Sequence, residues 1–181
     1  LEIIRNQNER LKEHIEKVLQ LASLDKNRKA INLSKTDFYP HLIKLCKEFK
    51  LVSAMEGAEF NYEIKEARFM LNCEPMHLTN AINNLLDNAK KYNTESSNIF
   101  LESEIIDKNL YIIVKDNGIG IEKKDQKNVF KKHFRISSGD LYTIKGYGLG
   151  LNYVKKIINL HKGKIKLESK ILQTNLIGLS R

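Results

Sequence analysis

The amino-acid sequence predicts an α+β fold: a two-layer α/β sandwich, with a mixed sheet covered by helices on one face, preceded by a coiled-coil-like helix. Apolar residues recur every three or four positions in some segments, which is typical of amphipathic helices, and alternate in others, which is typical of half-buried strands. The 181 residues are 41% hydrophobic and 29% charged, which suits one compact domain plus an appendage and argues against disorder.

The first segment carries a coiled-coil pattern. Its residues at alternating spacings of three and four are Leu1, Ile4, Asn8, Leu11, Ile15, Val18 and Ala22. A single helix cannot bury such a stripe, so it needs a partner helix. The charged run from Asp25 to Lys29 then breaks the pattern. We therefore expect a helix over residues 1–25, a linker over 26–31 and a domain over 32–181.

Within that domain, the spacing predicts alternating types of element. The expected helices cover residues 40–49, 75–92 and 148–160, with Pro40 and Pro75 tolerated in first turns. The expected strands are 30–33, 60–64, 69–73, 99–105, 110–115, 164–168 and about 174–179. The polar, basic segment 122–145 is too long to be an idle connection, and we expect a lid there rather than a plain flexible loop.

Composition also restricts the partners. The net charge is +9, but the lysines are scattered over every segment, so we expect solvated faces and no nucleic-acid partner. Cys46 and Cys73 lack metal-site spacing, and we expect buried reduced thiols. No apolar run is long enough to cross a bilayer. Since the chain begins at Leu1, we expect a piece of a longer protein.

Three groups of residues could carry chemistry, and the first lies on the helix after Pro75. Asn84, Asn88 and Lys91 fall at i, i+4 and i+7 and therefore share one polar face. An asparagine carbonyl is an oxygen ligand suited to Mg²⁺, and a lysine nearby can meet phosphates. An ordinary solvated face is the alternative. The apolar stripe expected to face the sheet is Leu78, Ala81, Ile82, Leu85, Ala89 and Tyr92.

The second group is the run from Asp116 to Gly120, directly after an expected strand. Its two glycines, Gly118 and Gly120, allow a ligand to approach the backbone closely. The Asp116 carboxylate could accept a hydrogen bond from an exocyclic amine such as that of adenine. A simple turn is the alternative.

The third group is the glycine-rich run Gly146, Gly148 and Gly150, where a helix is expected to begin. Free N–H groups at a helix N-terminus favour phosphate. The run has neither the lysine of a Walker loop nor the third glycine of a dinucleotide fingerprint. Cations of the preceding segment, including Arg135, could neutralise phosphoryl charge.

Taken in order, these segments resemble the catalytic ATP-binding domain of sensor histidine kinases of two-component systems. The matching runs are NLLDNAKKY from Asn84, DNGIGI from Asp116, FKKHFR from Phe130 and GYGLGL from Gly146. The resemblance implies the Bergerat-type ATP-binding fold of the gyrase, Hsp-type chaperone, histidine kinase and MutL superfamily. It also implies that residues 1–25 are the second helix of a dimerisation hairpin.

By this resemblance, ATP and Mg²⁺ are the cofactors, and Asn88 is the metal ligand. Asn84, Lys91 and Arg135 take catalytic roles, with Arg135 facing the γ-phosphate. The residues implied to bind the nucleotide are Asn88, Tyr92, Asp116, Gly118, Gly120, Gly146, Gly148, Gly150 and Thr174. His133 and Tyr147 depart from the usual residues of the lid, and Gln173 and Leu176 depart from those around Thr174.

The resemblance further implies transfer of the γ-phosphoryl group to a histidine, for relay to an aspartate of a response regulator receiver domain. None of the five histidines is followed by a phosphoacceptor pattern, so we expect that histidine upstream of Leu1. We also expect a homodimer formed through the N-terminal helix, and a membrane-anchored parent protein with this part on the cytoplasmic side.

Other functions stay open at the level of sequence. ATPases of the same superfamily resemble this pattern but place a glutamate, the base for hydrolysis, where this chain has Asn84. A serine-kinase anti-sigma factor would not need the coiled-coil helix. A degenerate module used only for nucleotide binding or dimerisation is a third alternative, and the intact Asn88 and Asp116 argue against it.

Overall fold

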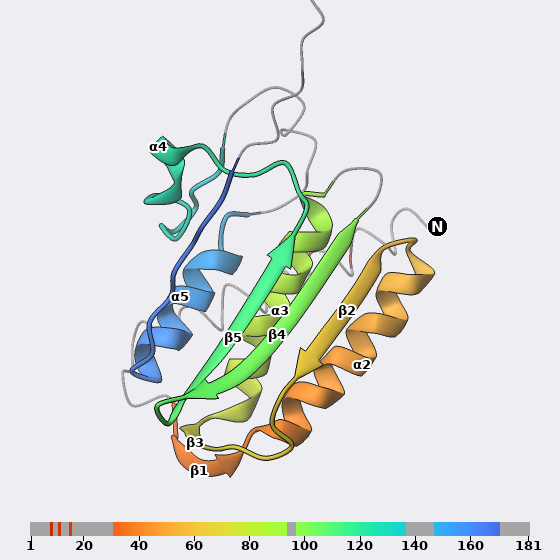
Figure 1. The fold of residues 1–181 in the computed structure, drawn as a ribbon. Helices are drawn as coiled ribbons and strands as arrows, with labels where there is room; N and C mark the ends of the chain where they lie inside the picture. Colours follow the sequence, from red (N-terminus) through yellow and green to blue (C-terminus); the bar gives the residue numbers. More distant parts are fainter. Residues whose placement is uncertain are drawn as a thin grey trace, which may run out of the picture.

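The computed structural model describes residues 31–93, 97–136 and 147–170, together with Asn8, Leu11 and Ile15. The elements of the domain in chain order are β1 (Ser34–Asp37), α2 (Tyr39–Met55), β2 (Glu59–Ile64), β3 (Met70–Cys73), α3 (Pro75–Lys91), β4 (Asn98–Ile106), β5 (Asn109–Asp116), α4 (Lys123–Gln126) and α5 (Gly150–Leu160) (Figure 1).

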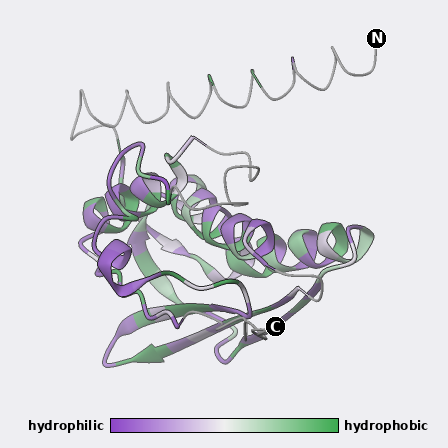
Figure 2. Ribbon diagram, turned by 90° about the horizontal axis from the view of Figure 1, so that it is seen from above, coloured by the Kyte–Doolittle hydropathy of each residue, from purple (hydrophilic) through white to green (hydrophobic). Residues whose placement is uncertain are grey.

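The strands form a three-stranded mixed sheet and a separate two-stranded pair. In the three-stranded sheet β2 pairs with β4 in parallel, and β4 pairs with β5 in antiparallel fashion. A separate antiparallel pair joins β1 to β3. The long helices lie in one layer and the three-stranded sheet in the other (Figure 2). This arrangement confirms the α+β sandwich that the sequence predicts.

Two expected strands are wrong. The strand expected over residues 30–33 is found four residues later, as β1. Its position is fixed by Asp37, whose Oδ1 accepts hydrogen bonds from the N–H groups of Tyr39 and Phe69. No strand forms over residues 164–168, where the backbone has no regular structure. The strand expected near 174–179 lies outside the described residues.

Helix α3 begins as its sequence predicts. The Glu74 carboxylate caps its N-terminus by accepting hydrogen bonds from the N–H groups of Met76 and His77. Its buried residues are Leu78, Ala81, Ile82, Leu86 and Ala89. The stripe therefore contains Leu86 where the sequence suggested Leu85. Leu85 packs instead against the apolar cluster of α5.

The main core lies between the sheet and helices α2 and α3. From the sheet, alternate residues of β4 (Ile99, Leu101 and Ser103) point into it and are fully buried. Cys46 and Cys73 are both free and buried, as expected. Burial raises the pKa of the Cys46 thiol to about 12, so this thiol stays protonated at neutral pH.

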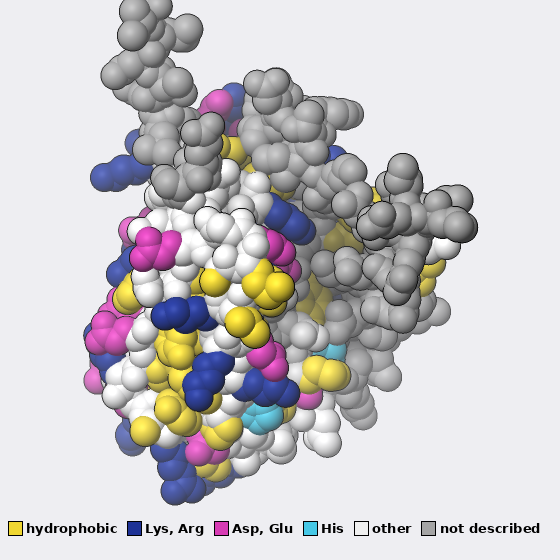
Figure 3. Space-filling view, turned by 90° about the vertical axis from the view of Figure 1, so that its right-hand side faces the viewer, with side chains coloured by type: hydrophobic (Ala, Val, Ile, Leu, Met, Phe, Trp, Pro, Cys, Tyr) yellow, Lys and Arg dark blue, Asp and Glu magenta, His cyan; other side chains and the backbone are white. Residues whose placement is uncertain are grey.

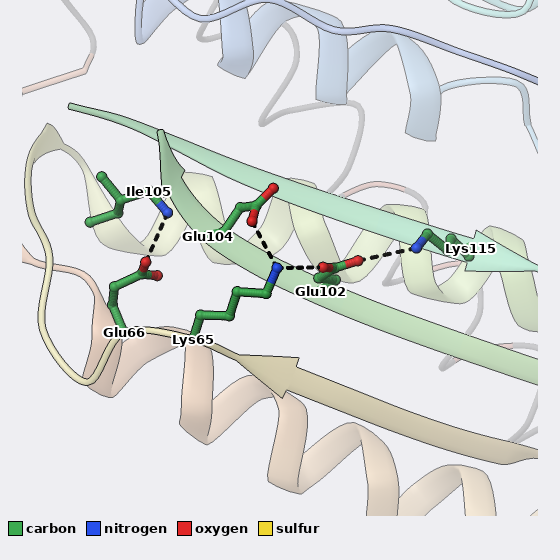
Figure 4. Close-up of polar contacts among 6 residues, drawn as sticks. All are labelled: Lys65, Glu66, Glu102, Glu104, Ile105 and Lys115. Carbon is green, nitrogen blue, oxygen red and sulfur yellow. Dashed lines mark hydrogen bonds and ion pairs between the residues drawn. The ribbon is translucent and has the colours of Figure 1, made fainter. Parts of the chain in front are cut away.

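The opposite face of the sheet carries charged side chains. Lys65 Nζ lies 3.0 Å from Glu102 Oε1 and 2.8 Å from Glu104 Oε2, and Lys115 Nζ lies 3.1 Å from Glu102 Oε2 (Figure 4). Glu66 accepts a hydrogen bond from the Ile105 N–H. These contacts attach the chain after β2 to β4, on a face that also exposes Ile106, Tyr111 and Ile113.

The face that carries α2 shows hydrophobic side chains interspersed with lysines (Figure 3). The exposed apolar residues near the end of α2 are Leu51, Val52 and Met55. Within the expected N-terminal helix, Asn8, Leu11 and Ile15 are helical and exposed. The rest of that segment and residues 26–30 lie outside the described residues. Among the residues that the structure describes, no helix is long and apolar enough to span a membrane.

Ser103 provides a test of this core. Its hydroxyl is completely buried, and no described residue forms a hydrogen bond with its Oγ. Burying an unpaired hydroxyl costs about 1–3 kcal/mol, whereas the methyl of alanine carries no such cost. Ser103→Ala is expected to raise the free energy of unfolding by about 1 kcal/mol in urea denaturation. The exposed Ser34→Ala serves as control, and a loss of stability in Ser103→Ala would contradict the packing described.

Candidate functional site

Helix α3 presents a row of asparagines beside its buried stripe. Asn84 and Asn88 are half-buried and lie one turn apart. Asn80 lies one turn before them, and its backbone carbonyl accepts a hydrogen bond of 2.8 Å from Asn84 Nδ2. Because its amide nitrogen is engaged in this way, the oxygen of Asn84 is directed away from the start of the helix. The side-chain oxygen of Asn84 is therefore presented at the surface of α3.

The start of α5 lies against these asparagines. A Cβ atom added at Gly150 would stand 3.0 Å from Asn84 Oδ1 and 3.9 Å from Asn88 Nδ2. Gly150 is the first residue of α5, an eleven-residue helix whose first-turn N–H groups have no partner within the helix. The positive end of the α5 dipole and the Asn84 oxygen consequently face the same space, an arrangement that suits a phosphate and its cation.

The end of β5 is joined to the end of α3. Asp116, the last residue of β5, has an exposed side chain whose Oδ1 accepts a 2.8 Å hydrogen bond from the Gly118 N–H. A Cβ atom on Gly118 would lie 2.6 Å from the Tyr92 carbonyl oxygen, so only glycine fits here. The Tyr92 carbonyl oxygen also accepts a hydrogen bond of 3.1 Å from the Ile119 N–H. Asp116 is thereby held at the same end of the sandwich as the last turn of α3 (Figure 1).

The last turn of α3 connects the two parts of the site. Tyr92, which caps the helix, donates its N–H to the Asn88 carbonyl. The Tyr92 carbonyl contacts the loop that follows Asp116. This loop therefore lies at the end of α3, one helical turn beyond Asn88. Lys91 is exposed at the last position of α3. Gly120 follows in the same turn as Gly118.

The described start of the expected lid folds onto the glycine-rich run. Gly148 has a φ of +67°, and its carbonyl accepts a 3.0 Å hydrogen bond from the His133 N–H. A Cβ atom at Gly148 would lie 2.7 Å from the Phe134 carbonyl oxygen. The packing therefore depends on backbone atoms, and His133 is accommodated in spite of its unusual identity for this position. Arg135 follows directly and is exposed.

Not every expected site residue is joined to this arrangement. Gly146 and Thr174 lie outside the described residues. A separate cleft of about 420 Å³ lies between α2 and the start of α3. None of the predicted site residues lines it, so the assignment of the site depends on the contacts above and not on cavity size.

A metal ion at this site would depend on neutral ligands. Within the described ranges there is no group of three or more His, Cys, Asp or Glu side chains that could hold an ion. The amide oxygens of Asn84 and Asn88 fit a hard cation such as Mg²⁺, which keeps several waters and takes further oxygens from a bound phosphate. The residues present thus suit a cation that arrives with a nucleotide.

Sequence reasoning missed several residues that build the site. Asn80 belongs to the same i, i+4 row as Asn84 and Asn88, and that spacing could have revealed it. Gln126 donates from Nε2 to the carbonyls of Ile121 and Ser169, which anchors the beginning of the lid. Asn152 donates from Nδ2 to the Phe130 carbonyl. No local pattern indicates the bonds from Gln126 to Ser169 and from Asn152 to Phe130, because these partners are distant in sequence.

Known proteins and one family of domains are similar to this chain. The family described as histidine kinase-, DNA gyrase B- and HSP90-like ATPases matches residues 73–176. Sensor protein RprX of Bacteroides fragilis is 34% identical over 171 residues, which cover 93% of this chain and 33% of RprX. Sensor histidine kinase WalK of Bacillus subtilis is 26% identical, over 93% of this chain and 28% of WalK. The chain thus spans about a third of the length of these relatives.

Solved structures share the fold. Full-length ShkA in complex with AMPPNP gives a TM-score of 0.71 at 19% identity, covering 86% of this chain and 32% of ShkA. The histidine kinase AdeS of Acinetobacter baumannii gives 0.66 at 22% identity, covering 86% of this chain and 70% of AdeS. The resemblance stated from the motifs is confirmed. Since the family match extends over more than half of the 181 residues, the chain belongs to the histidine kinase-, DNA gyrase B- and HSP90-like ATPase family, and its relatives include sensor histidine kinases.

Proposed function

We propose that this chain binds Mg-ATP at the end of the sandwich where α3, α5 and β5 meet. We further propose that, within its complete protein, it donates the γ-phosphoryl group to a histidine outside this sequence. The observation that carries the proposal is the close approach of Gly150, at the α5 start, to Asn84 Oδ1 and Asn88 Nδ2. A helix N-terminus beside side-chain amides suits a phosphate chain and its cation.

The remaining roles follow from position. Asp116 would accept a hydrogen bond from the exocyclic amine of adenine, and Gly118 and Gly120 would allow the base to approach the backbone. Tyr92 and Thr174 would contact the nucleotide, and Gly146, Gly148 and Gly150 would shape the loop around the phosphates. Asn88 would hold Mg²⁺, while Lys91 and Arg135 would neutralise phosphoryl charge. The cation, when bound, would offset charge on the phosphate oxygens.

Transfer is favoured over hydrolysis by one residue. A hydrolytic member of the superfamily needs a base to activate water, and an asparagine side chain cannot accept a proton for that purpose. Asn84, half-buried and bound to the Asn80 carbonyl, can only orient and coordinate. We therefore propose a protein-histidine kinase and not an ATPase.

The partners proposed for the complete protein follow from this function. The phosphoryl group would pass to the aspartate of a response regulator receiver domain. A solved complex of the histidine kinase ThkA with the response regulator TrrA has a TM-score of 0.67 to this chain, at 18% identity and covering 89% of it and 43% of that chain. We also propose residues 1–25 as a dimerisation helix, joined by a linker over 26–31 to a catalytic domain over 32–181.

The role of Asp116 is tested by Asp116→Asn, which keeps an oxygen for the Gly118 N–H and removes the charge. A hydrogen bond to a charged group contributes about 1.5–3 kcal/mol, so the dissociation constant for ADP is expected to rise roughly ten- to hundredfold. Isothermal titration calorimetry measures it. Glu63→Gln, an exposed carboxylate on β2, is the matched control and should bind ADP like the wild type. Equal affinities in all three proteins would contradict the assignment.

The roles of Asn84 and Asn88 are distinguished by titrating the protein with ADP, once in the presence of Mg²⁺ and once in the presence of EDTA. Asn88→Ala is expected to abolish the difference between the two titrations, because the metal loses its protein ligand. Asn84→Ala should keep ADP affinity and its Mg²⁺ dependence but slow phosphoryl transfer in the complete protein. Asn83→Ala, whose side chain bonds Asp87 on the same helix, is the control for general effects on α3. The reverse pattern would show that the two roles are exchanged.

The reaction itself is tested with the complete protein and ATP labelled at the γ-phosphate. Protein-bound label that is lost in acid but kept in base is expected, since phosphohistidine has this stability. The 181-residue chain alone should acquire none. Release of labelled inorganic phosphate without any protein adduct would instead identify an ATPase. Absence of both products would identify a degenerate module, and a separate titration with ADP would show whether that module still binds nucleotide.

A further inference from the structure

Helices α3 and α5 are joined by polar contacts inside an otherwise apolar cluster. Tyr153 is buried on α5 among Ala81, Leu149, Val154 and Ile157. Its hydroxyl lies 2.8 Å from His77 Nδ1, on the first turn of α3. Burial raises the pKa of Tyr153, so the hydroxyl stays neutral. One tyrosine on α5 is thus joined to the first turn of α3.

The same two helices meet again at the candidate site. There the Asn80 backbone carbonyl accepts the hydrogen bond from Asn84 Nδ2. That bond leaves Asn84 Oδ1 facing Gly150, at the start of the helix that carries Tyr153. The Tyr153–His77 bond and the approach of Gly150 to Asn84 therefore connect α5 with α3 at two places.

A second attachment holds the other end of α5. His161, which caps the end of α5, accepts a 3.0 Å hydrogen bond at Nε2 from the Glu74 N–H and lies 2.8 Å from the Ile157 carbonyl through Nδ1. Glu74 caps the start of α3. The end of α5 is thereby fixed to the start of α3, and the two helices run in opposite directions.

These directional bonds set the position of α5 along α3. Apolar packing is non-directional and tolerates small shifts between helices. A hydrogen bond, in contrast, is lost when the distance between donor and acceptor increases by about 1 Å. A slip of one residue moves a helix by about 1.5 Å along its axis. Such a shift would withdraw the α5 N-terminus from Asn84 and Asn88. The purine side of the site is independent, because Asp116 and Gly118 contact the Tyr92 end of α3 and not α5.

We propose that Tyr153 is a positioning residue for the phosphate half of the nucleotide site, acting through its bond to His77. The proposal rests on the nucleotide-binding function proposed above. It states that this bond affects the recognition of phosphate groups and leaves the recognition of the purine unchanged. A residue that merely stabilises the fold would affect both in the same proportion.

The experiment compares ADP with adenosine, which lacks phosphate, on Tyr153→Phe and wild-type protein. Calorimetry gives the dissociation constant for ADP, and chemical-shift titration gives that for adenosine. Loss of one neutral hydrogen bond corresponds to roughly a two- to tenfold weaker ADP affinity, with adenosine affinity unchanged. His77→Leu should have the same effect, while His77→Gln, which keeps an acceptor, should bind ADP more tightly than His77→Leu does. Cys46→Ala lowers stability in the other core and should change neither constant.

The outcomes are distinct. Selective loss of ADP affinity in Tyr153→Phe, with partial recovery from His77→Leu to His77→Gln, supports the proposal. Equal losses for ADP and adenosine, or no change for either ligand, overturn it while leaving the proposed function intact. A wild-type protein that binds neither ligand overturns the proposed function itself, and this inference with it.

Discussion

The close approach of the β5 end to the α3 end is the contact on which the rest of the site depends. Gly118 brings its backbone against the Tyr92 carbonyl, where any side chain would collide. β5 and α3 belong to different layers of the sandwich, and this contact joins the end of the strand to the end of the helix. The loop that follows Asp116 is thereby placed beside Tyr92, which lies one helical turn after Asn88.

Helix α3 serves two purposes that compete for its surface. One face fills the core with apolar side chains, and an adjacent face carries the asparagine row against α5. The polar face is not left to water, because the Asn84 amide nitrogen donates a hydrogen bond to the Asn80 carbonyl. Since a half-buried amide without partners is costly, this bond makes a polar row tolerable beside the core.

Much of this architecture could be predicted from the sequence, because it is encoded in local patterns. The acidic cap at Glu74, Pro75 and the apolar spacing of α3 predict that helix to within a residue, and the alternation of β4 and β5 predicts their pairing. Around Ile165 the alternation is real, since Ile165 and Leu167 are half-buried between exposed neighbours. The segment is held instead by Ser169, which accepts a bond from the Ile121 N–H. Alternation reports burial on one side and not strand pairing.

The parallel pairing of β2 with β4 has a consequence for how the chain folds. Parallel neighbours cannot be joined by a tight turn, and here the connection from Ile64 to Asn98 contains β3 and the whole of α3. The helix that bears the asparagines is therefore also the crossover of the sheet. Contacts of such long sequence separation form slowly, because loop closure precedes any stabilising contact. We infer that α3 docks while the sheet closes, so that the asparagine row and the start of α5 come together with the tertiary structure rather than ahead of it.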